Sequence, residues 1–263
     1  MTAAVQYTTQ LQAGLGMVPE TLDLLRLWKP GMIPARLAEE VVQAGLFSRA
    51  TARRARNLVV EMFAPRYLVD HGQAAARLKF LNERRFHQEA MAQLCFLYTA
   101  RAQRILADFV VEIYWPKYSG GASSMSRHDA EKFVQCALDS GRTAMRWSDS
   151  TVKRVSGYLL GCCADFGLLA SSGRGERSIQ RFSMRPEVAL YLAHELHFSG
   201  TSDTAIIKHR DWLLFGFEPV EVLNRLKSLS HDGHFVVQSS GEFVQISWKY
   251  QTMEDCLHAL TQR

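Results

Sequence analysis

One continuous stretch, residues 147–186, constrains the fold more than any other part of the chain. It reads WSDSTVKRVSGYLLGCCADFGLLASSGRGERSIQRFSMRP. The stretch opens with N-cap candidates at Ser148, Asp149 and Ser150. Apolar residues then recur at helical spacing, at Val152, Val155, Leu159, Cys162 and Phe166. Gly167 is the kind of residue that lies just past a helix C-terminus. The pattern predicts an amphipathic helix with one apolar and one polar face.

Strand signals follow this helix directly. Leu168 and Leu169 open a short strand, residues 171–175 form a Ser- and Gly-rich turn, and residues 178–183 alternate as a return strand. Residues 145–147 are expected to form the short strand that often precedes such a helix. A helix, a strand, a basic Gly-rich tip and a second strand are the order of a winged helix-turn-helix. In that fold a helix enters the DNA major groove and the wing touches the backbone beside it.

The distribution of charge supports this interpretation more than the total of +5 does. Residues 142–185 hold eight Lys/Arg and three Asp/Glu, a net of +5, and residues 1–141 hold seventeen and thirteen, a net of +4. Residues 186–263 hold six and ten, a net of −4. A basic first two-thirds suits a nucleic acid, and an acidic last third suits a protein partner. Ordinary scatter of surface charge remains the alternative.

The central stretch therefore supplies a set of candidate DNA contacts. Ser150, Lys153 and Arg154 would lie in or beside the major groove, with Arg146 just ahead of the helix. Three wing residues would contact phosphate or reach the minor groove, namely Arg174, Arg177 and Arg181. Asn and Gln, which read bases with two hydrogen bonds, are absent from residues 148–166. Binding with little sequence preference is therefore expected.

The N-terminal region predicts a second basic helix. Helices are expected over residues 19–28 and 34–44, and a third begins at Ser48 and runs to about Phe63, where Ala64-Pro65 stops it. A helix, a Gly-containing turn and a further helix have helix-turn-helix spacing. The third helix carries clustered arginines at Arg49, Arg53, Arg54 and Arg56. They form a second candidate phosphate-contacting surface. Alternatively, they form a solvated face that is partly paired with Glu39 and Glu40.

The remaining elements complete a mainly α fold with small β wings. Two helices are expected between residues 73 and 114, broken near 82–86 and ended by Trp115-Pro116, and Ser126 opens another with a capping box. A helix from Pro186 to about Phe198 follows. A helix from Pro219, a hairpin over residues 234–248 and a closing helix over residues 252–261 repeat the winged-helix plan in outline. Because this second module carries mixed charge, it is interpreted as structural or protein-contacting.

Four parts follow from these patterns. Residues 1–118 form an N-terminal helical domain with a helix-turn-helix, and residues 119–125 form a linker. Residues 126–200 form a winged helix-turn-helix, and residues 201–263 form a second, winged-helix-like domain.

Signals for catalysis, metals and membranes are weak. No nucleotide-binding, zinc-protease or nucleophile-elbow motif occurs, and the histidine pairs at 194/197 and 231/234 lack matching ligand motifs. No enzyme activity, cofactor or metal is therefore expected. Five cysteines without a CxxC spacing suit reduced thiols in the cytoplasm. No signal peptide and no apolar run of about 18 residues is seen, so membrane insertion is not expected.

Two segments carry a family resemblance. AGLGMVPETLDLLRLW at residues 13–28 is followed by the helix pair at 34–63, and HFVVQSSGEFVQISWKYQTMEDCL stands at residues 234–257. Together they resemble the BrxA family of the bacteriophage exclusion (BREX) defence systems of bacteria. The resemblance implies a small, non-enzymatic, double-stranded DNA-binding component that acts beside a methyltransferase, a phosphatase-like protein and ATPases.

The residues and the resemblance lead to one hypothesis and two rivals. The hypothesis is a BREX component that binds duplex DNA mainly through its backbone, with other BREX proteins as partners. One rival is a protein-interaction scaffold within the defence complex, and the other is a transcription regulator of its own operon.

Overall fold

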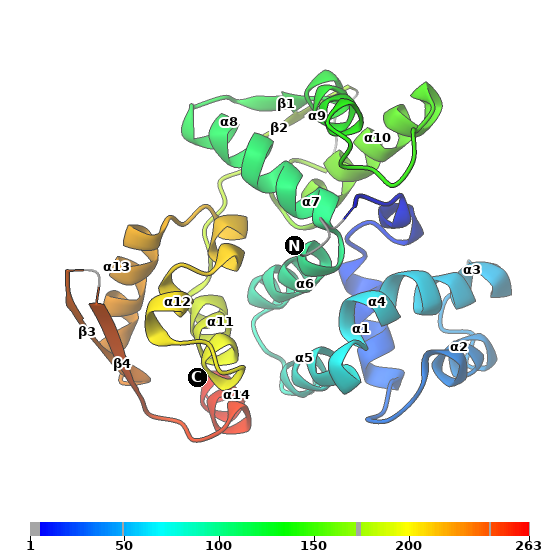
Figure 1. Ribbon diagram of the computed structural model, residues 1–263. Coiled ribbons are helices and arrows are strands. Elements are labelled where there is room, and N and C mark those ends of the chain that lie inside the picture. Colours follow the sequence, from blue (N-terminus) through cyan, green and yellow to red (C-terminus); the bar gives the residue numbers. More distant parts are fainter. Residues whose placement is uncertain (1–5, 49, 172–174, 242, 263) are drawn as a thin grey trace. The chain divides into compact units, whose positions relative to one another are not determined.

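A computed structural model describes residues 6–48, 50–171, 175–241 and 243–262 (Figure 1). The chain is mainly helical and contains two small two-stranded antiparallel sheets, β1–β2 and β3–β4. It divides into two compact units. The first contains the chain up to Asn82 together with Cys95–Phe182, and the second contains Glu83–Leu94 together with the chain from Ser183 onward. Each unit is therefore built from segments that are separated in sequence.

The first unit begins with short helices whose ends agree with the sequence signals. Helix α1 spans Val18–Leu27, α2 spans Pro34–Gln43 and α3 spans Ala52–Asn57. A proline occupies the first turn of α1 and of α2, where its missing N–H is not needed. The Thr51 hydroxyl caps α3 by accepting a hydrogen bond from the backbone N–H of Arg54. The first two predicted helices are confirmed, and the third begins later than expected.

Two prolines that were expected to end helices lie inside helical segments instead. A π-helical turn, Leu58–Phe63, continues into α4, Ala64–Tyr67, and a second, Val110–Tyr114, continues into α8, Trp115–Ser119. Pro65 and Pro116 each take the second position after the π turn. The expected stops at Ala64-Pro65 and Trp115-Pro116 are therefore wrong. A proline ring clashes with the preceding turn of a regular α-helix, and the wider π turn accommodates it.

Three α-helices lie between these two proline sites. Helix α5 spans Gln73–Glu83, α6 spans Gln88–Ala102 and α7 spans Arg104–Phe109. The break that was predicted near residues 82–86 lies between α5 and α6. A second break, at Gln103, was not predicted. Gln103 has φ −122° and ψ 83°, so the backbone leaves the helical region there.

The stretch that follows places a small sheet beside two helices. Strand β1, Ser124–Ser126, leads into α9, Arg127–Asp139, which is followed by α10, Asp149–Asp165, and by β2, Glu176–Ser178. The strands β1 and β2 pair antiparallel, with Met125 opposite Arg177. The predicted capping box of α9 is present, because Ser126 and Asp129 exchange hydrogen bonds.

The strand expected over residues 145–147 is absent from this part of the chain, and the paired strand stands before α9 instead. Ahead of α10 the backbone makes one parallel bridge, between Thr143 and Tyr7. The N–H of Tyr7 donates to the carbonyl of Arg142 at 2.7 Å. The backbone just before residue 145 thus pairs with the N-terminal segment. Tyr7 and Thr143 are far apart in sequence, so a local pattern does not reveal this pairing.

The second unit contains the remaining helices and the longer hairpin. Helix α11 spans Pro186–Phe198, α12 Asp203–Ile207, α13 Pro219–Ser230 and α14 Met253–Thr261, with a 3-10 helix over Arg210–Phe215. Strands β3, Phe235–Ser240, and β4, Phe243–Trp248, form the hairpin. The Asp203 carboxylate ties α12 to β4 by accepting from the N–H of Ile246 and the indole N–H of Trp248. The helices from Pro186 and Pro219, the hairpin and the closing helix are confirmed.

Residues 119–125, expected to be a linker, contain the last residue of α8 and the first residues of β1. The division of the chain into the four predicted parts remains a prediction.

Candidate nucleic-acid interface

Helix α10 is anchored by one apolar face. The apolar stripe seen in the sequence is buried, at Val152, Val155, Leu159, Cys162 and Phe166. The Ser148 hydroxyl accepts a hydrogen bond from the N–H of Thr151 and caps the N-terminus. At the C-terminus Gly167 has φ 78°, and the N–H of Leu168 donates to the carbonyl of Cys163 at 2.8 Å. This left-handed glycine closes the helix as predicted.

The opposite face of α10 is exposed and basic. Ser150, Lys153, Arg154 and Gly157 are all exposed, and they stand at positions i, i+3, i+4 and i+7. Residues at this spacing lie above one another on a helix. Within the described residues, neither the Lys153 ammonium nor the Arg154 guanidinium forms an ion pair or a hydrogen bond. We call these four residues the α10 face.

A hairpin follows α10 and extends the sheet. Leu169 bridges Ile179 antiparallel, the N–H of Ala170 donates to the carbonyl of Ser178, and the N–H of Gln180 donates to that of Leu168. The N–H of Ile179 donates to the carbonyl of Ser123, beside β1. Residues 168–170 and 176–180 therefore form a hairpin whose second arm also pairs with β1. Along the chain, the order is therefore β1, α9, α10 and then the hairpin. The second arm of the hairpin pairs with β1 on one side and with residues 168–170 on the other.

The wing arginines differ in their surroundings. Arg177 is half-buried, and its Nη1 donates to the backbone carbonyls of Ala170 and Ser171 at 3.0 and 2.9 Å. This nitrogen thus holds the two sides of the hairpin together. Arg181 is exposed, as is Arg146 ahead of α10. Arg174 lies outside the described residues.

The second predicted surface, on α3, is also exposed. Arg53, Arg54 and Arg56 are exposed, whereas Arg49 lies outside the described residues. The sequence left open a pairing of these arginines with Glu39 and Glu40. Both carboxylates pair instead with Arg36 on their own helix, α2. We call Arg53, Arg54 and Arg56 the α3 cluster.

The sequence did not indicate a groove between α9 and α10, which encloses about 520 Å³. It is lined by His128, Glu131, Lys132, Gln135, Cys136, Asp149, Val152 and Lys153. Across the two helices, the Arg127 Nη2 donates to the backbone carbonyl of Lys153 at 3.0 Å, and its Nε pairs with Glu131.

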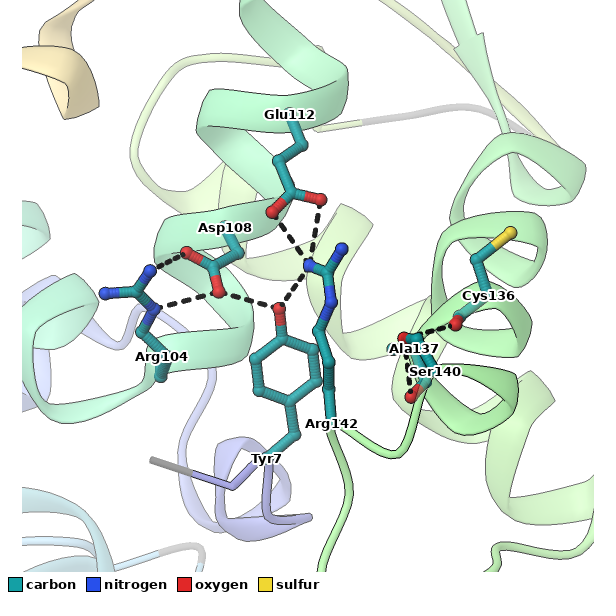
Figure 2. Close-up of polar contacts among 8 residues, drawn as sticks. All are labelled: Tyr7, Arg104, Asp108, Glu112, Cys136, Ala137, Ser140 and Arg142. Carbon is teal, nitrogen blue, oxygen red and sulfur yellow. Dashed lines mark hydrogen bonds and ion pairs between the residues drawn. The ribbon is translucent and has the colours of Figure 1, made fainter. Parts of the chain in front are cut away.

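A polar cluster holds the segment between α9 and α10, and it also escaped the sequence analysis (Figure 2). The Tyr7 hydroxyl donates to the Asp108 carboxylate at 2.7 Å and accepts from the Arg142 guanidinium at 3.1 Å. Arg142 also pairs with Glu112, and Arg104 pairs with Asp108. Tyr7 is 2% exposed, and burial together with its bond to Asp108 raises the pKa of its hydroxyl.

This Tyr7 cluster joins the N-terminal segment, the helix containing residues 104–114 and the loop after α9 (Figure 2). Its members are separated by up to 135 positions in sequence. The cluster therefore fixes the start of the loop that leads to Arg146 and the α10 face.

Few titratable groups in the described part of the chain suit metal binding or nucleophilic chemistry. It contains no group of three or more His, Cys, Asp or Glu side chains that could hold a metal ion. All five cysteines are free thiols, and only Cys136 is exposed. Burial raises the pKa of Cys95, Cys162 and Cys256 to about 12, so these thiols stay protonated near neutral pH.

Over the described residues, none of the helices is both long enough and apolar enough to cross a membrane.

The fold and the interface define a mainly helical protein with two small antiparallel sheets and an exposed basic helix face. A sequence model of the BrxA family matches residues 5–195, and the chain belongs to the BrxA family. The resemblance found in the sequence is thereby confirmed. Membership associates the chain with BREX phage defence and suggests other BREX proteins as partners.

A crystal structure of an uncharacterized protein from Magnetospirillum magneticum is similar, with a TM-score of 0.57 and 17% sequence identity. The match covers 73% of this chain and 95% of that chain. At this identity the likeness concerns the fold alone. The comparison with curated proteins found no match.

Proposed function

We propose that this protein is a non-enzymatic, double-stranded DNA-binding component of a BREX defence system. The α10 face enters or borders the major groove as the recognition face of a winged helix-turn-helix, and the arms of the hairpin, residues 168–170 and 176–180, lie along the backbone. The observation that carries the proposal is the α10 face itself. Two cations stand side by side on an exposed helix face with no acidic partner among the described residues. A polyanion supplies the missing counter-charge.

Gly157 gives independent support for close contact at this face. A glycine inside a helix costs about 0.5–1 kcal/mol relative to alanine. A Cβ added at Gly157 would meet nothing within 4 Å, so the protein's own packing does not require a glycine there. A glycine on the exposed side lets another surface approach the helix backbone. A DNA duplex beside Lys153 and Arg154 is such a surface.

The proposed binding is mainly to the backbone. The α10 face carries lysine, arginine and serine but neither asparagine nor glutamine, so few groups can read base edges with two hydrogen bonds. The α3 cluster offers a second set of phosphate contacts. With five to eight phosphate contacts in all, affinity should fall about 10²- to 10⁴-fold between 50 and 200 mM salt.

The test is fluorescence anisotropy with a random-sequence duplex across a salt series. The double variant Lys153→Ala/Arg154→Ala should bind at least about tenfold more weakly at low salt, because it loses two phosphate contacts. The matched control, Lys208→Ala/Lys227→Ala, removes two exposed lysines from the second unit and should bind as the wild type does. Equal DNA affinity of the two double variants would refute the proposal that the α10 face contacts DNA. A strong preference for one promoter duplex would favour the regulator instead.

A second candidate function is a protein-interaction scaffold. Exposed apolar side chains favour it: Val220 on α13 and Val236 and Phe243 on the β3–β4 hairpin are 71%, 56% and 67% exposed. These residues lie in the acidic last third of the chain. Co-purification with BREX partners that persists after nuclease treatment, and that Phe243→Ser abolishes, would support the scaffold.

A further inference from the structure

The interior of the first unit contains a cation without a described counter-charge. Arg66, in α4, is 2% exposed. Its Nε, Nη1 and Nη2 are shielded from solvent, and none of them has a hydrogen-bond partner among the described residues. A guanidinium carries five N–H donors and keeps its charge at every pH at which proteins fold. Leaving such a group buried and unpaired is strongly unfavourable.

Three buried hydroxyl groups share this environment. The hydroxyls of Thr21 of α1, Tyr67 of α4 and Thr99 of α6 are likewise shielded from solvent. The hydroxyls of Thr21 and Thr99 lie within hydrogen-bond reach of the Tyr67 oxygen and act to lower its pKa, against the larger effect of burial. Together with Arg66, these side chains bring polar groups from three helices into one closed region.

The neighbours of Arg66 cannot balance its charge. The guanidinium acts electrostatically on Tyr67, on Cys95 of α6 and on Cys162 of α10. Burial raises the pKa of both thiols to about 12 and raises the pKa of Tyr67 as well. All three groups are therefore neutral near pH 7. The Asp165 carboxylate also acts on Cys162, but it forms no ion pair with Arg66, so no described residue pairs directly with the guanidinium.

We propose that Arg66 is the centre of a buried binding site for a small monovalent inorganic anion of about the size of chloride. Arg66 supplies the charge and directional N–H donors, and the nearby hydroxyls supply further donors. Thr21, Tyr67, Cys95, Thr99 and Cys162 are all fully buried, which favours a small ion over a phosphate or a carboxylate ligand. The anion would join α1, α4 and α6 to α10. This inference does not depend on DNA binding.

The first experiment follows unfolding of the wild-type protein in urea at constant ionic strength while bromide replaces gluconate. A specific site multiplies the ratio of folded to unfolded protein by 1 + [bromide]/Kd, so at a bromide concentration ten times Kd the ratio rises about elevenfold. Arg66→Met replaces the cation with an apolar chain of similar length and should remove this dependence. Arg36→Met, at an exposed arginine, should retain it. An unchanged bromide effect in Arg66→Met would overturn the proposal.

The second experiment needs no variant and so decides the matter even if Arg66→Met does not fold. Crystals of the wild-type protein grown in bromide should show an anomalous-scattering peak within hydrogen-bond distance of the Arg66 guanidinium. A crystal in bromide with no such peak would overturn the proposal, since ordered water would then solvate the guanidinium.

Discussion

His194 shows at the residue scale how burial changes the chemistry of a side chain. It lies in α11, is fully buried, and its ring packs 4.9 Å from that of Trp248. Its Nδ1 donates to the carbonyl of Leu190 at 2.7 Å. Burial lowers the pKa of His194 to about 4, and the nearby charges of His234 and His197 act in the same direction. The folded protein therefore holds this imidazole neutral.

This lowered pKa predicts a loss of stability in acid. Because the unfolded chain binds a proton near pH 6.5 and the folded chain only near pH 4, the contribution of His194 is complete above pH 6.5 and falls as the pH drops. Between pH 7.5 and pH 5 the free energy of unfolding should decrease by about 2 kcal/mol from this residue. Urea unfolding of the wild type and of His194→Phe at both pH values measures it. An equal decrease in the two proteins would contradict the assignment.

Gly157 makes a prediction in which stability and binding change in opposite directions. Gly157→Ala should raise the free energy of unfolding by about 0.5–1 kcal/mol, because alanine favours the helix and its Cβ meets nothing. DNA affinity should nevertheless fall, and it should fall further in Gly157→Leu, as the added side chain holds the duplex away. Thermal unfolding and anisotropy measure the two effects. Ala205→Leu, at an exposed helical position of the second unit, is the matched control. If Gly157→Leu binds DNA as tightly as the wild type does, the duplex does not contact the α10 face.

At the scale of elements, proline positions and hairpin contacts depend on more than local propensity. Pro65 and Pro116 read as helix stops in the sequence, yet the chain stays helical through π turns before each of them. The sequence predicts that Arg177 contacts DNA from the wing, yet its Nη1 donates hydrogen bonds to two backbone carbonyls within the hairpin. Its contact with DNA remains a prediction and would use its other nitrogen atoms.

The hairpin contact of Arg177 can be tested directly. Arg177→Met removes two hydrogen bonds to backbone carbonyls and should cost about 1–2 kcal/mol of unfolding free energy. The loss should be local, so the amides of Ala170 and Gln180, which pair the two arms, should exchange with solvent faster than in the wild type. Hydrogen exchange measures this, with the amides of α14 as an internal reference. Unchanged exchange at both amides would show that the contact does not hold the hairpin.

At the scale of the whole molecule, the salt dependence of DNA binding tests whether both basic surfaces contact the same duplex. Both the α10 face and the α3 cluster belong to the first unit. Each phosphate contact contributes about 0.9 to the slope of log affinity against log salt. Removing Lys153 and Arg154 should therefore lower the slope by about 2, and removing Arg53, Arg54 and Arg56 by about 3. Anisotropy across a salt series measures both, and an unchanged slope for the α3 variant would leave that cluster as solvated surface.

Local signals in the sequence predicted much of the fold. The apolar stripe of α10, its Ser148 cap and the left-handed Gly167 all act within a few residues, so their effects could be read directly. The same holds for α11, for α13 and for the β3–β4 hairpin. The exposure of Lys153 and Arg154 followed from the same periodicity, because a helix with one apolar face turns the other to solvent.

The sequence by itself thus determined α10, α11, α13, the β3–β4 hairpin and the apolar face of α10, since caps, turns and periodicity act over short distances. Only the tertiary structure decided which polar groups form hydrogen bonds or ion pairs within the protein and which are buried. Strand β1 pairs with β2 about fifty residues away, Tyr7 binds Asp108 and Arg142, and Arg66 is closed off between helices distant in sequence. Pairing and burial depend on which distant segments meet in space, and no local pattern carries that information.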